Sequence, residues 1–262
     1  MKRKLIVLIA VGLLVGTVVI PPAGEVEKSY YCFGVEATIV GTPASEYLRG
    51  TTGDDVIVAR GGADDVHGGA GNDLICGGPG NDWTWEDTVG NGGSGGLYGG
   101  SGDDWIRGGR GIDTLAGDGF DEGNGVSGAD VLYGGPGRDT LHDYISAHEY
   151  ARPEPLPGSD DRLFGGPGDD GVSATAGDDF LSGGLGNDRV GSAYWEYDNN
   201  SYEESLDHGD DVYVGGAGDD LIDTFDGVSG NDTANAGEGT DRCAEDDGDT
   251  IWSCEEDLVY GS

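Results

Sequence analysis

Aspartates recur at a spacing of nine residues and are the side chains in this sequence that could do chemistry. Asp55, Asp64, Asp73 and Asp82 show the spacing without interruption. Carboxylate oxygens are the ligands that hard cations such as Ca²⁺ prefer. The chain has 13 Lys and Arg residues against 51 Asp and Glu residues, which gives a formal net charge of -38. Cations are therefore the natural partners of these carboxylates.

Glycines accompany the aspartates and define a repeat. Residues 68–76 read GGAGNDLIC and residues 77–85 read GGPGNDWTW. Numbered from 1 to 9, both units have Gly at positions 1, 2 and 4 and Asp at position 6. Position 8 is the apolar Ile75 in the first unit and Thr84 in the second. Glycine adopts the positive φ values of a tight turn without strain. Positions 7 to 9 form a short strand in which position 8 points inward, so one unit supplies one turn and one strand.

Two units would complete one coil, and stacked coils would bring their aspartates together. Strands stack at about 4.8 Å, so carboxylates one coil apart would lie in adjacent rows beside the turn carbonyls. That space suits a cation with oxygen ligands. The register predicts that these residues pair: Asp55 with Asp73, Asp64 with Asp82, Asp113 with Asp130, Asp161 with Asp179, and Asp170 with Asp188.

The repeat resembles the RTX, or hemolysin-type, calcium-binding nonapeptide GGxGxDxUx. The resemblance extends over nearly everything after residue 40 and implies an all-β fold, a right-handed parallel β-roll or β-solenoid, with on the order of ten Ca²⁺ ions. Stacked carboxylates repel one another and the core is thin, so we expect folding to be coupled to Ca²⁺ binding. The expected metal ligands are Asp55, Asp64, Asp73, Asp82, Asp104, Asp113, Asp130, Asp139, Asp161, Asp170, Asp179, Asp188, Asp211, Asp220, Asp232 and Asp241.

Three units depart from the pattern. Glu46 takes the place of the aspartate in the first unit, which predicts a weaker site. Unit 90–98 has Gly95 at position 6, and unit 117–124 is one residue short, with Asp121 near position 6. Both are counted here as units of the roll, with a structural role. The roll is expected over residues 41–244, with loop insertions at 86–89, 143–155, 192–205 and 224–226.

The ends of the chain point to secretion. Lys2, Arg3 and Lys4 precede an apolar run from Leu5 to Ile20, the pattern of a secretory signal. We expect a signal peptide at 1–24. An uncleaved anchor is the alternative because no clean small-x-small cleavage site follows, although the run is marginally short for a membrane span. Caps are expected at 25–40 and 245–262.

The cysteines agree with an exported chain. Its four cysteines suggest two disulfides. Three pairings are possible, and we favour Cys32 with Cys76 and Cys243 with Cys254, because each would tie a terminal segment to the outermost coils. Reduced, buried thiols are the alternative.

Several function classes are disfavoured. The net charge makes nucleic acids and anionic membranes improbable partners. Ser94 lies in a GxSxG match, but a nucleophile elbow needs a long strand before it and a helix after it, so we expect no catalysis. The favoured function is a secreted calcium-binding structural or surface-interaction module. The alternatives are a carbohydrate-binding module that uses the aromatic residues of 192–205, including Trp195, and a polysaccharide-acting enzyme on the same scaffold. The expected partners are calcium and an extracellular polysaccharide or cell-surface component.

Overall fold

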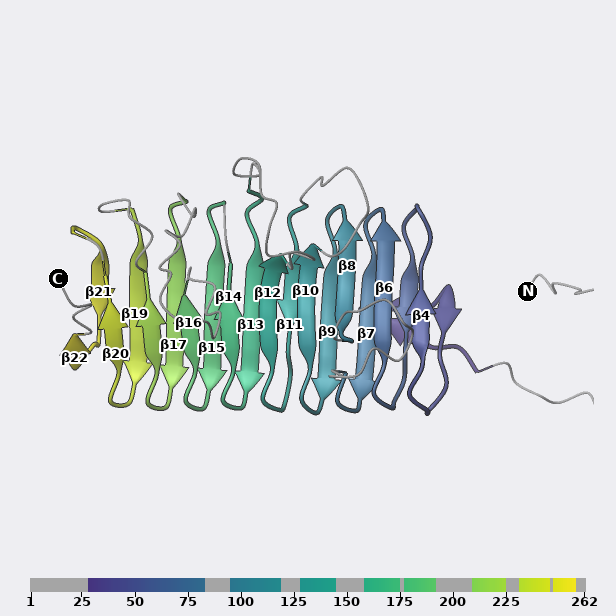
Figure 1. Ribbon diagram of the computed structural model, residues 1–262, viewed down its shortest axis with the longest axis horizontal. Coiled ribbons are helices and arrows are strands. Elements are labelled where there is room, and N and C mark those ends of the chain that lie inside the picture. The colour runs from purple at the N-terminus through teal and green to yellow at the C-terminus, as the bar shows by residue number, and fades with distance from the viewer. Residues whose placement is uncertain are drawn as a thin grey trace, which may run out of the picture.

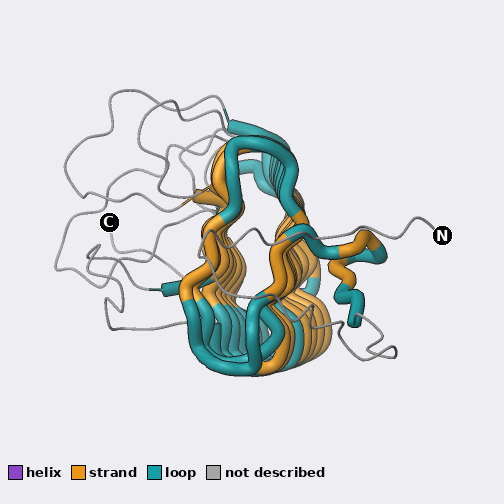
Figure 2. Tube along the Cα trace, turned by 90° about the vertical axis from the view of Figure 1, so that its right-hand side faces the viewer, coloured by secondary structure: helices purple, strands orange, loops and turns teal. Residues whose placement is uncertain are grey.

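Two parallel β-sheets face each other along the whole length of the molecule (Figure 1). The computed structural model describes residues 28–82, 95–118, 128–144, 158–174, 177–191, 209–224, 231–245 and 247–257. Strands alternate between the sheets along the chain, so one sheet contains odd-numbered strands and the other even-numbered strands, ten in each. We call them the odd sheet and the even sheet. Viewed along the axis, successive coils superimpose as a closed outline with the two sheets on opposite sides (Figure 2). The predicted all-β parallel β-roll is confirmed.

The strands are short. The odd sheet contains β3 (Ile39–Val40), β5 (Val56–Val58), β7 (Leu74–Pro79), β9 (Trp105–Arg110), β11 (Val131–Tyr133), β13 (Arg162–Pro167), β15 (Phe180–Leu185), β17 (Val212–Ala217), β19 (Thr233–Glu238) and β21 (Thr250–Trp252). The even sheet contains β4 (Tyr47–Arg49), β6 (Asp65–Ala70), β8 (Leu97–Ser101), β10 (Thr114–Asp118), β12 (Thr140–Tyr144), β14 (Gly171–Ser173), β16 (Arg189–Gly191), β18 (Leu221–Asp223), β20 (Arg242–Ala244) and β22 (Glu256–Asp257).

Position 8 of each repeat forms the core. In the odd sheet Ile57 pairs with Ile75, and Ile75 pairs with Ile106, so equivalent residues lie directly above one another. All three side chains have no exposed surface. Because side chains alternate across a strand, positions 7 and 9 point away from this interior. The core is therefore two columns of single apolar side chains that meet between the sheets.

The turns form two edges of the roll. At the odd-to-even edge, an odd strand turns into the next even strand, and at the even-to-odd edge, an even strand turns into the next odd strand. The odd-to-even turns follow one another regularly along the bottom of Figure 1. From β10 onward, each even-to-odd turn includes residues outside the described ranges. The odd-to-even edge also has a stretch outside the described ranges, residues 83–94 between β7 and β8.

Two of the predicted units do not form half-coils of their own. Asp82 ends the turn after β7, and the next described strand is β8, in which Leu97 pairs with Val66. Unit 77–85 and unit 90–98 therefore share a single strand, with residues 83–94 between. Likewise β10 is followed directly by β11, so unit 117–124 adds no strand among the described residues. The prediction that each weak unit forms a half-coil of its own was wrong, although Leu97 of unit 90–98 takes position 8 of β8 as expected.

The boundary of the central insertion also differs from the prediction. Strand β12 continues to Tyr144, so Asp143, which was assigned to the insertion at 143–155, belongs to the even sheet. Asp118 of β10 pairs with Tyr144, and main-chain pairing continues there without the repeat glycines. At 224–226, Thr224 also keeps its main-chain hydrogen bond to Ala244. The insertions 86–89 and 192–205 lie outside the described residues.

Disulfides fasten both ends. Cys32, in the antiparallel hairpin of β1 (Tyr31–Cys32) and β2 (Val35–Glu36), bonds to Cys76 on the outer face of the odd sheet. Cys243 occupies position 8 of β20 and bonds to Cys254, which packs against the end of the core. Both favoured pairings are confirmed, and they fit an oxidising location. In the described part of the chain, no helix has the length and apolar character of a membrane span. The predicted signal at 1–24 lies outside the described residues.

Candidate metal sites at the two turn edges

The position 6 aspartates form a hydrogen-bonded ladder along each edge. At the even-to-odd edge, the main-chain N–H of Asp55 donates to Oδ1 of Asp73, one coil further on, at 2.7 Å. At the odd-to-even edge, Asp64 donates in the same way to Asp82 at 3.0 Å. The contact repeats from coil to coil as far as Asp232 at the even-to-odd edge and as far as Asp241 at the odd-to-even edge. Each carboxylate is thereby fixed in orientation by the preceding coil.

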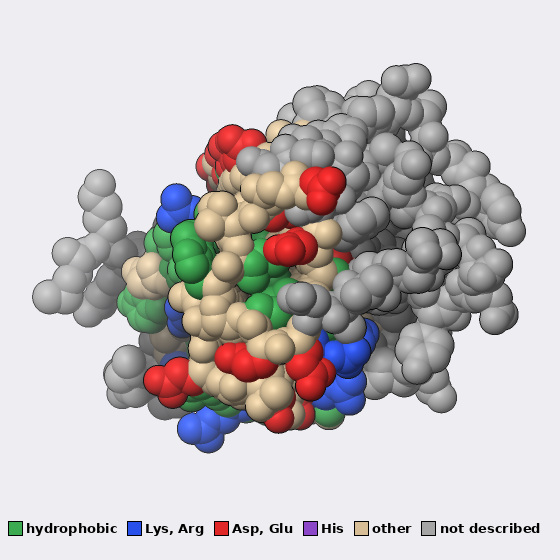
Figure 3. All heavy atoms as spheres, turned by 90° about the vertical axis from the view of Figure 1, so that its left-hand side faces the viewer, with side chains coloured by type: hydrophobic (Ala, Val, Ile, Leu, Met, Phe, Trp, Pro, Cys, Tyr) green, Lys and Arg blue, Asp and Glu red, His purple; other side chains and the backbone are tan. Residues whose placement is uncertain are grey.

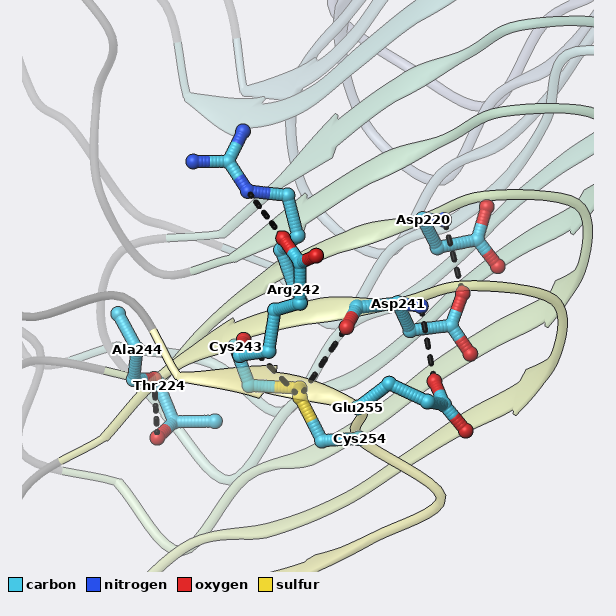
Figure 4. Close-up of a disulfide and its surroundings, with 9 residues drawn as sticks. Asp220, Thr224, Asp241, Arg242, Cys243, Ala244, Cys254 and Glu255 are labelled. Carbon is cyan, nitrogen blue, oxygen red and sulfur yellow. Dashed lines mark hydrogen bonds and ion pairs between the residues drawn. A yellow bond between two sulfur atoms is a disulfide. The ribbon is translucent and has the colours of Figure 1, made fainter.

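Figure 4 shows the last steps of the odd-to-even ladder. The N–H of Asp220 donates to Oδ1 of Asp241, and the N–H of Asp241 donates to Oε2 of Glu255, both at 2.9 Å. The disulfide between Cys243 and Cys254 lies beside this final step. A glutamate therefore ends the ladder close to the terminal crosslink.

The second carboxylate oxygen has no donor at most positions. All of the aspartates predicted as ligands are buried. Among the described residues, no hydrogen-bond donor reaches Oδ2 of Asp64, Asp73, Asp82, Asp104, Asp113, Asp130, Asp139, Asp170, Asp179, Asp188, Asp220 or Asp241. A buried, unpaired carboxylate oxygen is costly. A bound cation would supply the missing partner.

Glycine at position 1 makes room for this oxygen. A Cβ added to Gly68 would lie 2.4 Å from Oδ2 of Asp73, and one added to Gly183 would lie 2.4 Å from Oδ2 of Asp188. The turn carbonyls also crowd this space, since a Cβ on Gly100, where φ is +119°, would lie 1.9 Å from the carbonyl oxygen of Gly69. The turns therefore have no side chains at these glycine positions and are lined by carboxylate and carbonyl oxygens. This donor set is suited to Ca²⁺.

The electrostatics also favour a cation. Burial, assisted by neighbouring aspartates, raises the pKa of Asp104 to about 8 and the pKa of Asp130 to about 10. At the odd-to-even edge, burial raises the pKa of Asp113 and of Asp170 to about 6. The carboxylates are thus costly to ionise without a counter-ion, most of all in the middle of the even-to-odd edge.

Two predicted ligands have a different environment. Asp55 accepts hydrogen bonds at both oxygens, from the Thr38 hydroxyl at 3.2 Å and the Thr51 N–H at 2.7 Å. Asp211 accepts the Tyr213 hydroxyl at Oδ2, at 2.7 Å, because Tyr213 replaces the usual aliphatic residue at position 8. Protein donors therefore occupy oxygens that are without a donor in most other turns.

Four of the five predicted pairings are found in the ladders, and one is wrong. Asp113 does not pair with Asp130. Asp113 precedes β10 at the odd-to-even edge and pairs with Asp139, whereas Asp130 precedes β11 at the opposite edge and pairs with Asp104. The error arose from counting the short unit 117–124 as a half-coil.

Position 5 carries a second ladder that was not predicted from the sequence. The N–H of Asn72 donates to Oδ1 of Asp54 at 3.0 Å, and the N–H of Asp219 donates to Oδ1 of Asn187 at 2.9 Å. These bonds run in the opposite direction to those of position 6. The signal was the repeated presence of Asn or Asp directly before the position 6 aspartate.

The other candidate residues lie on outer surfaces or outside the described ranges. Trp105 lies at position 7 and is 43 % exposed, as its position predicted. Trp195, the other loop aromatics and Ser94 lie outside the described residues. Figure 3 views the C-terminal end of the roll, where acidic side chains are spread around the backbone. At this end of the roll, acidic side chains are thus exposed at the surface as well as buried in the turns.

Comparison with known families agrees with this geometry. The model of the RTX calcium-binding nonapeptide repeat matches residues 40–75, 49–83, 97–115, 115–142, 158–190, 207–222 and 222–251, more than half of the chain. The unmatched stretches 84–96 and 143–157 overlap the interruptions of the roll. No curated protein matches the chain. The stacked glycine turns, the two aspartate ladders and this match together show that the chain belongs to the RTX calcium-binding nonapeptide repeat family.

Proposed function

We propose that this chain is a secreted protein that folds when multiple Ca²⁺ ions bind along both turn edges. The observation that carries the proposal is the column of buried Oδ2 atoms without donors, each above a bare glycine turn. In each site, position 6 aspartates of adjacent coils and the turn carbonyls would hold the ion. Calcium would supply positive charge to a chain with a formal net charge of -38 and would offset the repulsion within each ladder.

Secretion is part of the proposal. The apolar N-terminal run, the two disulfides and the need for abundant free Ca²⁺ all fit an extracellular protein. We assign no catalytic activity to the chain.

Equilibrium dialysis of the disulfide-bonded protein against ⁴⁵Ca²⁺, with excess Mg²⁺ present, tests the metal function. Several tightly bound ions per chain are expected. Asp139→Asn, which removes one buried charge of the odd-to-even ladder, should lower the number of bound ions. Binding that Mg²⁺ displaces completely would show only a general attraction to an acidic surface and would refute the proposal.

A second candidate function, carbohydrate binding, is supported by the outer face of the odd sheet. Tyr133 and Phe164 stack with ring centroids 5.1 Å apart and planes 10° apart, and Phe180 lies 5.5 Å from Phe164. The column begins at Phe33 of the N-terminal hairpin, whose ring lies 5.4 Å from that of Trp105. Partly exposed aromatic faces of this kind can stack on sugar rings.

Two arginines make the outer face of the odd sheet suited to acidic ligands. Arg107 and Arg110 line a groove of about 540 Å³ together with Tyr133. The Arg107 guanidinium lies 4.5 Å from the centroid of Phe33, and neither arginine forms an ion pair within the described residues. Arginine pairs well with planar carboxylates. Calcium bound in the turns would partly offset the net charge of -38 that disfavours polyanions, and we propose that the groove then accepts carboxylate-bearing sugars of an extracellular polysaccharide.

Binding to polygalacturonate, measured by affinity electrophoresis in saturating Ca²⁺, tests this second function. Arg107→Ala with Arg110→Ala should abolish retention, and Trp105→Ala should weaken it. Arg242→Ala, whose guanidinium lies 3.9 Å from Glu256, is the matched control and should retain binding. Loss of binding only in Trp195→Ala would place the site in the 192–205 segment and contradict the groove.

A further inference from the structure

Asp143 stands where the repeat has its first glycine. In the register of the even sheet, Leu141 pairs with Leu115 and Tyr144 pairs with Asp118, so Asp143 is equivalent to Gly117. In regular turns this position faces the position 6 carboxylate, as at Gly165, where an added Cβ would lie 2.7 Å from Oδ2 of Asp170. At residue 143 an aspartate side chain takes that place.

The substitution brings three carboxylates together. Oxygen atoms of Asp143, Asp161 and Asp179 all lie within 4.8 Å of one another. The three residues are 5 %, 2 % and 1 % exposed, respectively. Asp161 and Asp179 belong to adjacent coils and are fixed by the ladder contact, in which the Asp161 N–H donates to Oδ1 of Asp179 at 2.7 Å. The group therefore joins two repeat carboxylates and one that the repeat does not supply.

An independent observation points to a ligand. Oδ2 of Asp179 is buried and receives no hydrogen bond from any described residue. Neither Asp161 nor Asp179 forms an ion pair with a basic side chain in the described part of the chain. Asp179 thus presents an unpartnered oxygen to a buried cluster that already contains two further carboxylates.

We propose that Asp143, Asp161 and Asp179 form a distinct Ca²⁺ site that binds more tightly than the regular turns. This inference rests on the proposed calcium function and deepens it, because it assigns one site of higher affinity to a residue outside the repeat pattern. Affinity of oxygen sites for Ca²⁺ depends on the number of charged ligands. Three carboxylates at this place exceed the two that successive position 6 residues supply.

The donor set suits Ca²⁺. This ion takes six to eight oxygen ligands in a flexible geometry, and carboxylates are among its usual ligands. Three carboxylates whose oxygens lie within 4.8 Å of one another could therefore share one such ion. Asp143 lies in β12 with an ordinary strand backbone rather than the positive φ of a turn glycine, so substitutions there do not strain the chain.

The test is Ca²⁺ titration calorimetry of the full chain with disulfides intact, for the native protein, Asp143→Asn and Asp143→Gly. Asp143→Gly restores the repeat residue and should convert the site to a regular turn. Both variants should weaken the tightest class of sites by about tenfold or more. Circular dichroism in saturating Ca²⁺ confirms that they fold.

Asp170→Asn is the matched control, since it removes a ladder carboxylate at the opposite edge. It should lower the number of ordinary sites and leave the tightest class unchanged. Native protein that binds many ions, with a tightest class unaffected in both Asp143 variants, would overturn this inference alone. Absence of Ca²⁺ binding by the native protein would overturn the proposed function itself, so the two failures are distinguishable.

Discussion

The main-chain N–H of Asp73 donates to Oδ1 of Asp104 at 2.7 Å, although the two residues are 31 positions apart in the sequence. The same contact joins Asp55 and Asp73, which are 18 positions apart. The ladder therefore continues across the interruption at 83–94 with unchanged geometry. The proposed calcium sites would therefore be defined by the stacking of coils, and the length of chain between the aspartates is secondary.

Asp104→Asn should remove a calcium site while preserving the ladder. Asparagine keeps the Oδ1 acceptor for the Asp73 N–H but loses the charge on a fully buried side chain. We expect a smaller number of bound ions and a higher Ca²⁺ concentration at the midpoint of folding. Asp103→Asn is the neighbouring control, because position 5 already carries asparagine at Asn72 and Asn81. Equal effects of the two variants in calorimetry would contradict the assignment of position 6.

Without calcium, the protein should become less stable as the pH rises. Burial raises the pKa of Asp139 to about 8 and that of Asp179 to about 9, above the ordinary value of 3.8. A raised pKa in the folded state gives stability that is complete below about pH 4 and is lost as the pH rises through the folded-state values. In chelator, we expect more β-structure by circular dichroism at pH 5 than at pH 8. The opposite order would show that these carboxylates are not buried in the metal-free fold.

Calcium should reverse this pH dependence. Protons and Ca²⁺ compete for the same oxygens, so binding releases protons and affinity rises with pH. Calorimetry at pH 6 and pH 8 in buffers of different ionisation enthalpy measures the protons released. A pH-independent affinity would indicate ligands other than these aspartates.

Gly184→Ala should destabilise the calcium-loaded roll. Gly184 has a φ of +120°, and an added Cβ would lie 2.2 Å from the carbonyl oxygen of Gly166 in the preceding coil. Because that neighbour is main chain, we expect a loss of about 1–3 kcal/mol in the free energy of unfolding. Gly171→Ala is the control, since nothing lies within 4 Å of its added Cβ, and it should be neutral or mildly stabilising. Urea unfolding in saturating Ca²⁺ measures both, and similar losses would refute the steric argument.

Loss of the C-terminal disulfide should loosen the last coil. Replacing Cys243 and Cys254 with alanine removes a crosslink over 11 positions, worth about 3 kcal/mol by loop entropy, and opens the end of the core. Hydrogen exchange should become faster across residues 242–257 and remain slow near β9. The Cys32 and Cys76 double alanine variant should instead affect the hairpin β1–β2. Unchanged exchange at 242–257 would show that the disulfide is dispensable for the cap.

Much of this fold could be predicted because each residue type in the repeat has one physical role. Position 8 residues such as Ile75 are buried, and position 6 residues such as Asp73 line the turns, as the period indicated. Pairing of Cys32 with Cys76 followed from their places near the start of the array. The first two inferences depend on local spacing, and the third depends on where the cysteines lie relative to the repeat array.

The remaining features depend on which units complete a half-coil. The sequence of a divergent unit such as 117–124 is similar to that of its neighbours. Counting one half-coil more or fewer nevertheless assigns the following aspartate to the opposite edge of the roll. That ambiguity produced the wrong pairing of Asp113 with Asp130. Asp143 was missed for a related reason, since only the strand pairing of β12 shows that it occupies a glycine position.

Far-UV circular dichroism during a Ca²⁺ titration, with Mg²⁺ as the control ion and disulfides intact, tests the central claim most directly. The ladders of buried carboxylates predict a cooperative transition from coil to β-structure at neutral pH with Ca²⁺ alone. A spectrum already rich in β-structure in chelator, and unchanged by Ca²⁺, would contradict the account, because the glycine turns would then stack without an ion between their aspartates.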